Sequence, residues 1–194
     1  MRTAAIILTA GESRRMGQVK AYLPFRGGTF LSVLADTFRP FCETVIAVFG
    51  FDGERLAALA PVGVQTTINP NYQAGMLTSL QAGLRLPGLA AFDRILFTLV
   101  DHPAVVPSTI RSLLATEAEI AIPRTAGKRG HPVLISAAIA RQFLDEPATA
   151  KVRDTIDRNA GLIEYVDVSD TAIHDDIDDP ALYAALLARE AGRG

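Results

Sequence analysis

The chain has 194 residues, of which 49% are hydrophobic and 21% charged, so it can bury a sizeable core and we expect one domain over residues 1–194. Its formal net charge of -2 argues against a protein that coats nucleic acid or binds membranes through basic residues. The single cysteine, Cys42, excludes an internal disulfide and a cysteine-based zinc cluster, and we expect its thiol to be buried or half-buried. No apolar stretch approaches the roughly 20 residues that span a bilayer, so we expect a cytoplasmic protein.

The first predicted element is a strand over residues 4–8. Five apolar residues without polar alternation are typical of a strand that is buried on both faces of a parallel sheet. The glycine-containing stretch 9–20 therefore leaves the carboxyl end of a strand, where ligands of open α/β sheets bind. Arg14, Arg15 and Lys20 place cationic donors beside that backbone, which suits a polyphosphate better than a neutral substrate.

This stretch matches none of the commoner phosphate-binding or nucleophile motifs. It contains neither the P-loop pattern nor the G-x-G-x-x-G dinucleotide fingerprint. Ser13 is a poor candidate for a nucleophile elbow, because its surroundings do not follow the pattern G-x-S-x-G. Taken alone, the stretch is equally compatible with a solvated basic loop.

Strands and helices alternate through the next part of the chain. Apolar spacing predicts a helix over residues 29–38 and a strand over 43–49, then a short helix over 52–59 and a strand over 64–68. Such alternation is typical of a parallel sheet with helices on both faces.

A hydroxyl group follows the third predicted strand. The turn 69–71 leads into a helix predicted over residues 75–84, and Ser79 lies in the first turn of that helix. Ser79 could face the same crevice as the basic loop, where free backbone N–H groups also point. The alternative, a serine that only satisfies its own helix end, is equally compatible with the sequence.

A carboxylate follows the next predicted strand, 94–100. Asp101 comes directly after this near-continuous apolar run, so it reaches the ligand crevice without a long loop. It can hold Mg²⁺ there, because that ion binds one or two carboxylates together with phosphate oxygens and water. The alternative is a capping or turn aspartate for the segment that leads to the helix predicted to begin at Pro107.

The second half adds two more strands and a basic loop. The strands are predicted over residues 119–122 and 131–135, with the loop over 123–130 between them. The loop could engage a second anionic group or be a solvated run of charge. Its cationic residues are Arg124, Lys128 and Arg129. No histidine metal cluster is expected, because the chain has only three histidines and they are isolated from one another in the sequence: His102, His131 and His174.

The last part of the chain ends on an acidic run and a helix. Helices are predicted over residues 137–144 and 151–159, a strand over 162–166, and a closing helix over 181–189. Asp179 fits the N-cap of the closing helix, which places Asp176 and Asp178 just before a helix start. Residues 191–194 are expected to fray.

Four features of this pattern point to one ligand: the basic loop, the helix-start hydroxyl, the carboxylate after a central strand and the late acidic pair. Together they could bind a nucleoside triphosphate with Mg²⁺. The sequence resembles the MobA/MocA-like nucleotidyltransferases, which build the nucleotide forms of the molybdenum cofactor. The resemblance is carried by L-T-A-G-x-S-x-R-M-G-x-x-K over 8–20, G-M-x-x-S-L over 75–80, D-x-P over 101–103, G-x-x-G-H-P over 127–132 and D-I-D-x-P over 176–180.

The resemblance implies a fold, a reaction and a set of site residues. The fold is α/β, a Rossmann-like three-layer α/β/α sandwich with a mostly parallel sheet, like that of the nucleotide-diphospho-sugar transferases. The reaction is transfer of a nucleotidyl group from an NTP with release of pyrophosphate. The implied nucleotide-binding residues are Leu8, Thr9, Ala10, Gly11, Ser13, Arg15, Lys20, Ser79 and Asp101, of which Lys20, Arg15 and Asp101 are catalytic.

The resemblance also assigns roles within this set. The backbone of residues 10–11 would flank the base, Arg15 would hold the triphosphate, and Lys20 would stabilise charge at the attacked α-phosphorus. Mg²⁺, or Mn²⁺ in its place, would be held by Asp101 and Asp178, with Asp176 as the alternative second ligand. Ser79 would contact the nucleoside, and His131 and Gly130 would lie towards the acceptor.

The implied nucleotide is CTP and the implied acceptor is a phosphorylated small molecule, molybdopterin or the molybdenum cofactor, with a molybdoenzyme as client. The loop at 9–11, with alanine before the glycine, resembles that of the cytidylyltransferases of the family, whereas the guanylyltransferases tend to have two glycines at these positions. Thr9, Val19, His102 and Asp179 depart from the usual residues of the motifs. GTP, and a sugar phosphate or alcohol phosphate as acceptor, therefore stay open.

Two other classes of protein stay open as well. A non-catalytic nucleotide-binding regulator or cofactor-insertion chaperone would bind CTP or GTP without releasing pyrophosphate. A dinucleotide-dependent oxidoreductase would share the fold class, although the chain lacks the glycine fingerprint.

Overall fold

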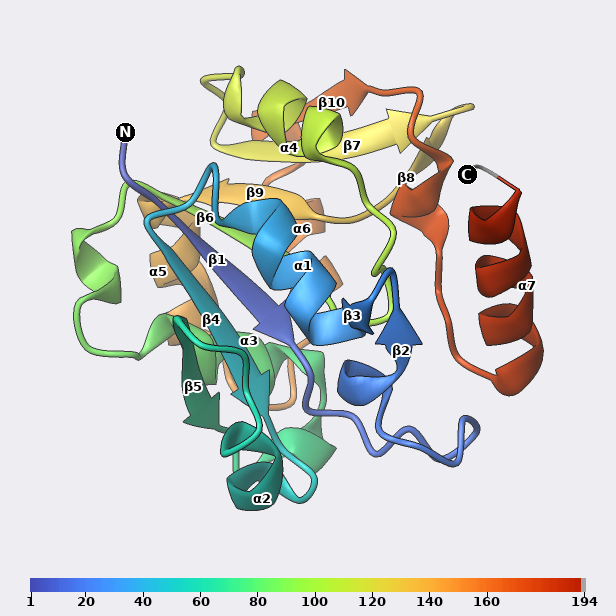
Figure 1. The fold of residues 1–194 in the computed structure, drawn as a ribbon. Helices are drawn as coiled ribbons and strands as arrows, with labels where there is room; N and C mark the ends of the chain where they lie inside the picture. The colour runs from blue at the N-terminus through green and yellow to red at the C-terminus, as the bar shows by residue number, and fades with distance from the viewer. Residues whose placement is uncertain (193–194) are drawn as a thin grey trace.

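The computed structural model describes residues 1–192 and is built around one mixed β-sheet (Figure 1). The strand order is β10-β7-β9-β6-β1-β4-β5, and β8 pairs with β7. The strands are β1 (Thr3–Leu8), β4 (Thr44–Phe49), β5 (Val64–Ile68), β6 (Arg94–Leu99), β7 (Ile120–Thr125), β8 (Lys128–Arg129), β9 (Val133–Ser136) and β10 (Ile163–Asp167). A separate ribbon joins β2 (Pro24–Phe25) to β3 (Gly28–Thr29).

The central strands run parallel to one another. Strand β1 lies between β4 and β6 and pairs in parallel with both, with Ile6 opposite Ile46 on one side and Phe97 on the other. Strand β9 is antiparallel to both of its neighbours, β6 and β7. The expected mostly parallel α/β sheet is confirmed, with one reversed strand inside it.

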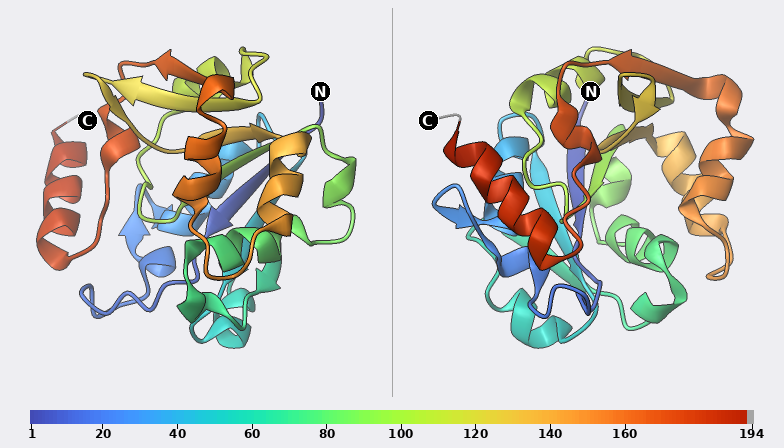
Figure 2. Two further views of the ribbon diagram at one scale, coloured as in Figure 1. Left: turned by 180° about the vertical axis from the view of Figure 1, so that it is seen from behind. Right: turned by 90° about the vertical axis from the view of Figure 1, so that its right-hand side faces the viewer.

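Helices cover both faces of the sheet (Figures 1 and 2). Alternate residues of β1 enter different cores, because side chains on a strand point to opposite faces: Ala5 and Ile7 pack into one hydrophobic cluster, and Ile6 and Leu8 into the other. The first cluster includes residues of α1 (Phe30–Phe38), α2 (Gly53–Ala57), α4 (Pro107–Leu114) and α7 (Pro180–Ala191). The second includes residues of α3 (Met76–Leu84), α5 (Ala137–Asp145) and α6 (Val152–Arg158).

The basic stretch 123–130 is a β-hairpin, whereas we expected a loop. Strand β7 continues through Thr125, and β8 pairs back onto it with Thr125 opposite Lys128. The two turn residues, Ala126 and Gly127, both have positive φ angles of 49° and 77°, as a tight two-residue hairpin turn requires. The expectation was wrong because Pro123 and the charged residues hid the strand pattern.

The ends of several helices differ from expectation by a few residues. Helix α2 covers Gly53–Ala57 where a helix over 52–59 was predicted, and α6 is likewise shorter than 151–159. Helix α7 continues through Ala191, so the fraying expected from residue 191 is not seen at that position. Gly192 is the C-cap of α7, and the part of that prediction that concerns residues 193–194 lies outside the described residues. Within residues 1–192 no helix is long and apolar enough to cross a membrane.

Cys42 lies buried between α1 and β4, as expected, with 7% of its surface exposed. Burial raises the pKa of the Cys42 thiol to about 12, so the reactive thiolate is scarce at ordinary pH. We predict that iodoacetamide at pH 8 labels the native protein far more slowly than the urea-unfolded protein, followed by mass spectrometry. Equal labelling rates in the two states would contradict the packing of α1 against β4.

Candidate functional site

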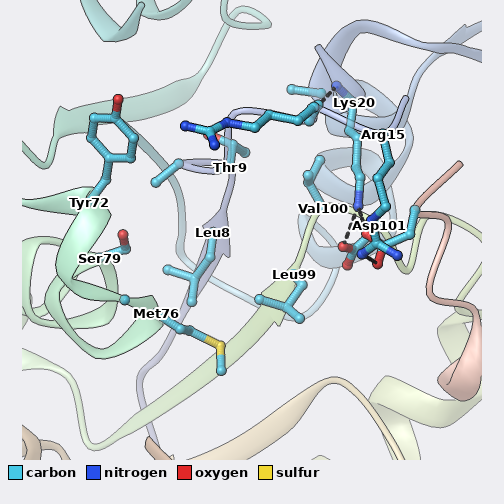
Figure 3. A pocket seen from close by; sticks show the side chains of 17 residues that line it. Leu8, Thr9, Arg15, Lys20, Tyr72, Met76, Ser79, Leu99, Val100 and Asp101 are labelled. Atoms are coloured by element: carbon cyan, nitrogen blue, oxygen red, sulfur yellow. Dashed lines mark hydrogen bonds and ion pairs between the residues drawn. The ribbon is translucent and has the colours of Figure 1, made fainter. Parts of the chain in front are cut away.

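A cavity of about 390 Å³ opens at the carboxyl ends of β1 and β6 (Figure 3). Charged side chains gather at one end of it, around Lys20 and Asp101, while Tyr72, Met76 and Ser79 lie at the other. The cavity brings together every residue that the sequence predicted for the nucleotide and the metal: Leu8, Thr9, Ala10, Gly11, Ser13, Arg15, Lys20, Ser79, Asp101 and Asp178.

The loop after β1 is fixed at its start by backbone hydrogen bonds. The backbone N–H of Thr9 donates to the Val48 carbonyl at 2.9 Å, and the Thr9 hydroxyl donates to the same oxygen at 2.7 Å. The Ala10 carbonyl accepts a hydrogen bond from the Phe51 backbone N–H at 3.3 Å. The Thr9 side chain is therefore bonded back to the sheet, and the cavity is bordered here by main chain.

Lys20 is the cationic centre of the site. It begins the 3₁₀ turn Lys20–Tyr22, and its backbone N–H donates to the Ser13 hydroxyl oxygen at 3.3 Å. Its ammonium group donates to Asp101 Oδ2 at 3.0 Å and also contacts Asp178 Oδ1. Burial by itself lowers the pKa of Lys20, but the two carboxylates outweigh it and the net pKa is raised. Lys20 is therefore charged at neutral pH.

The late acidic segment is tied to Asp101 and to α7. The Ile177 backbone N–H donates to the Asp101 carbonyl at 3.2 Å. Arg189 of α7 donates to Asp175 at 2.9 Å, and the Asp179 side chain accepts the Leu182 N–H at 2.9 Å as the N-cap of that helix. These bonds hold the segment between residues 175 and 179 against the end of β6.

Three carboxylates meet at this point and could hold a divalent metal ion. Asp101, Asp176 and Asp178 each offer an oxygen, and these atoms lie within 4.8 Å of one another. Asp101 Oδ1 is buried without a hydrogen-bond partner among the described residues, so it is free to take a ligand. Oxygen ligands of this kind suit hard cations such as Mg²⁺ and Mn²⁺. Sequence reasoning left Asp176 and Asp178 as alternatives, and both lie at the cluster.

The surroundings shift the pKa values of two of these carboxyl groups in opposite directions. Burial raises the pKa of Asp176, and the neighbouring charges of Asp101 and Asp178 raise it further. Burial also acts to raise the pKa of Asp178, but Lys20 and Arg15 outweigh it, so the net pKa is lowered. Arg15 forms an ion pair with Asp178, and both residues line the cavity.

His131 and Gly130, predicted to lie towards the acceptor, line a second cavity of about 250 Å³ rather than the first. Met76 lines both cavities and so marks where they meet. Gly130 also has a packing role, because a Cβ there would come within 2.3 Å of the Ile173 carbonyl oxygen.

The histidines are not all isolated, although the sequence suggested that they were. The rings of His102 and His131 have centroids 4.8 Å apart, and His102 Nε2 lies 3.7 Å from Asp101 Oδ1. Burial lowers the pKa of each to about 4, helped by Lys20 at His102 and by His102 at His131. Both are therefore neutral at pH 7, and among residues 1–192 the group with metal-ligand spacing is the acidic triad.

Within residues 1–192, the cationic residues of the basic hairpin share no common anionic partner. Arg124 pairs with Asp167 through two hydrogen bonds of 2.7 and 2.8 Å, whereas Arg129 lies 3.6 Å from Asp157 and lines the second cavity. Lys128 is exposed.

Sequence reasoning missed several residues that shape the first cavity. Tyr72, Met76 and Leu99 line it, and Asn69 lies behind it with its amide bonded to Ser79 Oγ at 3.0 Å. The sequence pattern predicts Leu99 and Met76 as core residues. They line the cavity because the end of β6 and the start of α3 border it, which the pattern does not show. For Asn69, the available signal was its place directly after a strand.

Known proteins resemble this chain in sequence and in fold. The MobA-like NTP transferase domain matches residues 5–162. The chain is 32% identical, over 178 residues and 90% of both chains, to the molybdenum cofactor cytidylyltransferase of Escherichia coli (strain K12). It is 34% identical, over 136 residues, to a molybdenum cofactor guanylyltransferase of Cereibacter sphaeroides, with 68% of this chain and 67% of the relative covered.

Solved structures share the fold. A nucleotidyl transferase from Methanothermobacter thermautotroptrophicus superposes with a TM-score of 0.83 at 22% identity, covering 100% of this chain and 99% of that one. Rv0371C from Mycobacterium tuberculosis H37Rv, solved in complex with manganese, gives 0.78 at 23% identity, covering 97% and 99%. The expected fold of the nucleotide-diphospho-sugar transferase type is therefore confirmed.

The contact of Lys20 with two of the three carboxylates predicts competition between its ammonium group and a metal ion. In Lys20→Met the competing charge is gone, and we expect Mn²⁺ to bind the nucleotide-free protein about tenfold more tightly or better, measured by electron paramagnetic resonance. Lys128→Met, which removes an exposed lysine, is the matched control and should leave the Mn²⁺ affinity unchanged. Equal or weaker binding in Lys20→Met would show that the metal lies elsewhere.

Proposed function

The chain belongs to the MobA-like NTP transferase family, and from this premise we propose that it transfers a cytidylyl group from CTP to a phosphorylated acceptor of the molybdopterin type. One observation carries the proposal: Lys20, Asp101 and Asp178, from the front, middle and end of the chain, meet in one cavity with the main chain after β1. A triphosphate with its metal ion needs this combination of cations and carboxylates.

In the proposed reaction, a phosphate oxygen of the acceptor attacks the α-phosphorus of CTP. A new P–O bond forms, the bond to the β-phosphate oxygen breaks, and pyrophosphate leaves with its electron pair. Lys20 and Arg15 exchange their carboxylate partners for phosphate oxygens and stabilise the charge that builds up there. No protein nucleophile takes part.

The proposed metal ligands are Asp101 and Asp178, with Asp176 beside them. Mg²⁺, with Mn²⁺ as a substitute, fits a site built from carboxylate oxygens alone. When bound, the ion would neutralise charge on the phosphate oxygens. The manganese complex of the structurally similar Rv0371C supports this choice by analogy.

The second cavity is the proposed acceptor site. It adjoins the nucleotide cavity at Met76, and Phe97 and Val133 give it an apolar lining that suits a flat heterocycle. Arg129 and Arg153 also line it and offer donors for an anionic group at the far end of the acceptor. Gly130 keeps this wall close to the rest of the fold.

CTP is favoured over GTP as the donor. The cytidylyltransferase relative aligns over 90% of this chain, whereas the guanylyltransferase relative aligns over 68%. Alanine before the glycine in Thr9-Ala10-Gly11 points the same way.

The direct test is release of pyrophosphate by the purified protein from each of the four NTPs, with Mg²⁺ and molybdopterin or molybdenum cofactor as acceptor. We expect release with CTP that depends on both acceptor and metal. Release with GTP instead would reassign the base, and release only with a sugar phosphate would reassign the acceptor. Binding of CTP without any pyrophosphate release would favour a non-catalytic chaperone.

Two substitutions test the proposed roles of Lys20 and Asp101. Lys20→Ala and Asp101→Asn should each lower kcat by about 10²–10³-fold, because each removes a group that stabilises charge in the transition state. Asp145→Asn, at an exposed position at the end of α5, is the matched control and should keep normal turnover. Near-normal kcat in both site variants, with folding checked by circular dichroism, would refute the assignment.

A further inference from the structure

We propose that the Tyr72 ring is the surface on which the nucleobase stacks, and that Gly50 is the residue that positions this ring. Tyr72 lines the nucleotide cavity at the end that it shares with Met76 and Ser79, away from Lys20 (Figure 3). The inference deepens the proposed function and rests on it, because it concerns how a nucleotide binds in this cavity.

The two ends of the cavity suit different parts of a nucleotide. Lys20 and Asp101 form an ion pair at one end, whereas Tyr72, Met76 and Ser79 at the other end carry no formal charge. A triphosphate and its metal ion need the charged end, so the nucleobase lies at the opposite end. There it meets the one aromatic side chain among the described residues that line the cavity.

The backbone that carries Tyr72 is fixed by a buried asparagine. Tyr72 begins the 3₁₀ turn Tyr72–Ala74, which follows β5 after residues 69–71. Asn69 is 3% exposed, and its side-chain oxygen accepts the Asn71 backbone N–H at 2.9 Å. The Asn71 carbonyl in turn accepts the Ala74 N–H at 3.0 Å. The position of Tyr72 is therefore set before a ligand binds.

Gly50 allows the Tyr72 ring to pack directly against the loop after β1. Gly50 follows β4, and a Cβ at this position would lie 2.5 Å from Tyr72 Cβ, 2.6 Å from Tyr72 Cγ and 2.7 Å from the Ala10 carbonyl oxygen. A larger residue would have to displace either the ring or the loop. Because Ala10 and Tyr72 both line the cavity, they form adjoining walls that meet over Gly50.

The far end of the ring is held as well. The Tyr72 hydroxyl donates to Glu12 Oε1 at 3.4 Å, and the Glu12 carboxylate also pairs with Arg14. The half-buried ring is thus fixed at both ends of its long axis, by Gly50 at the Cγ end and by Glu12 at the hydroxyl end. A ring held in this way loses little conformational freedom when a base stacks on it.

Stacking on Tyr72 contributes affinity for a nucleobase of any kind, because every base has a π-face. The contact holds one end of the nucleotide while Lys20 and the metal ligands hold the triphosphate at the other end. The two ends together place the α-phosphorus between them. Tyr72 is therefore assigned to the affinity and placement of the nucleotide.

Tyr72→Leu tests this assignment, because leucine is apolar but has no π-face. CTP and ribose 5-triphosphate share the sugar and the phosphates, so the ratio of the Kd for ribose 5-triphosphate to the Kd for CTP measures the contribution of the base. We expect this ratio to fall by about tenfold in Tyr72→Leu, through a higher Kd for CTP. Titration calorimetry with Mg²⁺ measures both constants and needs no acceptor.

Two controls separate stacking from the other contacts of the side chain. Tyr72→Phe keeps the ring and removes the bond to Glu12, and it should keep the ratio within about twofold of the wild-type value. Tyr165→Leu makes the same exchange as Tyr72→Leu at an exposed tyrosine of β10, outside the cavity, and should leave the ratio unchanged.

The role of Gly50 is tested by Gly50→Ala, with folding checked by circular dichroism. The added methyl group displaces the ring, so we expect the ratio to fall as it does in Tyr72→Leu. Gly161→Ala is the matched control, because a Cβ at Gly161 meets nothing within 4 Å. A folded Gly50→Ala protein with the wild-type ratio would contradict the positioning role of Gly50.

An unchanged ratio in Tyr72→Leu would overturn the inference. So would a fall of the same size in Tyr72→Phe, or an equal rise of both Kd values in Tyr72→Leu, which would place the ring against the sugar or the phosphates. In each of these cases a wild-type protein that still releases pyrophosphate from CTP leaves the proposed function intact. A wild-type protein that binds no nucleoside triphosphate would instead overturn the proposed function, and the inference with it.

Discussion

The site depends on the balance of charge where β6 ends. Three carboxylates, Asp101, Asp176 and Asp178, present oxygens within 4.8 Å of one another, and such a cluster repels itself unless cations are present. Lys20 and Arg15 supply these cations in the nucleotide-free protein. The same two side chains are the donors that a triphosphate would need. In the free site, Lys20 and Arg15 are therefore paired with the carboxylates. A bound metal ion and a bound nucleotide would together replace these ion pairs.

The topology of the sheet explains why distant parts of the chain meet there. Strands β1 and β6 are parallel neighbours, so their carboxyl ends carry Lys20 and Asp101 to the same edge. The segment 175–179 then brings the late carboxylates to that edge, where the Ile177 backbone N–H donates to the Asp101 carbonyl. Bonds from Arg189 and from the Leu182 N–H of α7 hold this segment in place. Because α7 packs into the hydrophobic cluster through Leu186, the position of the late carboxylates is linked to the packing of the core.

Sequence reasoning located the groups that follow strands, and it was weaker on contacts made between separate segments. Lys20, Asp101 and Ser79 were predictable because the end of a buried parallel strand is a known position relative to the ligand crevice. The contact between His102 and His131 was not, because it arises from the antiparallel pairing of β6 with β9, which puts the end of one strand beside the start of the other. The bond from Asn69 to Ser79 likewise joins a strand end to a helix that the sequence treats separately. The hairpin at 123–130 was hidden by Pro123, which lies within β7.

The most direct test of this account is the position of Mn²⁺ in crystals of the protein grown with CTP, located by anomalous diffraction. The account predicts an anomalous peak bound by Asp101 and by Asp178 or Asp176, with the triphosphate beside it and the Lys20 ammonium group on a phosphate oxygen. A peak away from these carboxylates, or a nucleotide bound with Lys20 still paired to both Asp101 and Asp178, would contradict it.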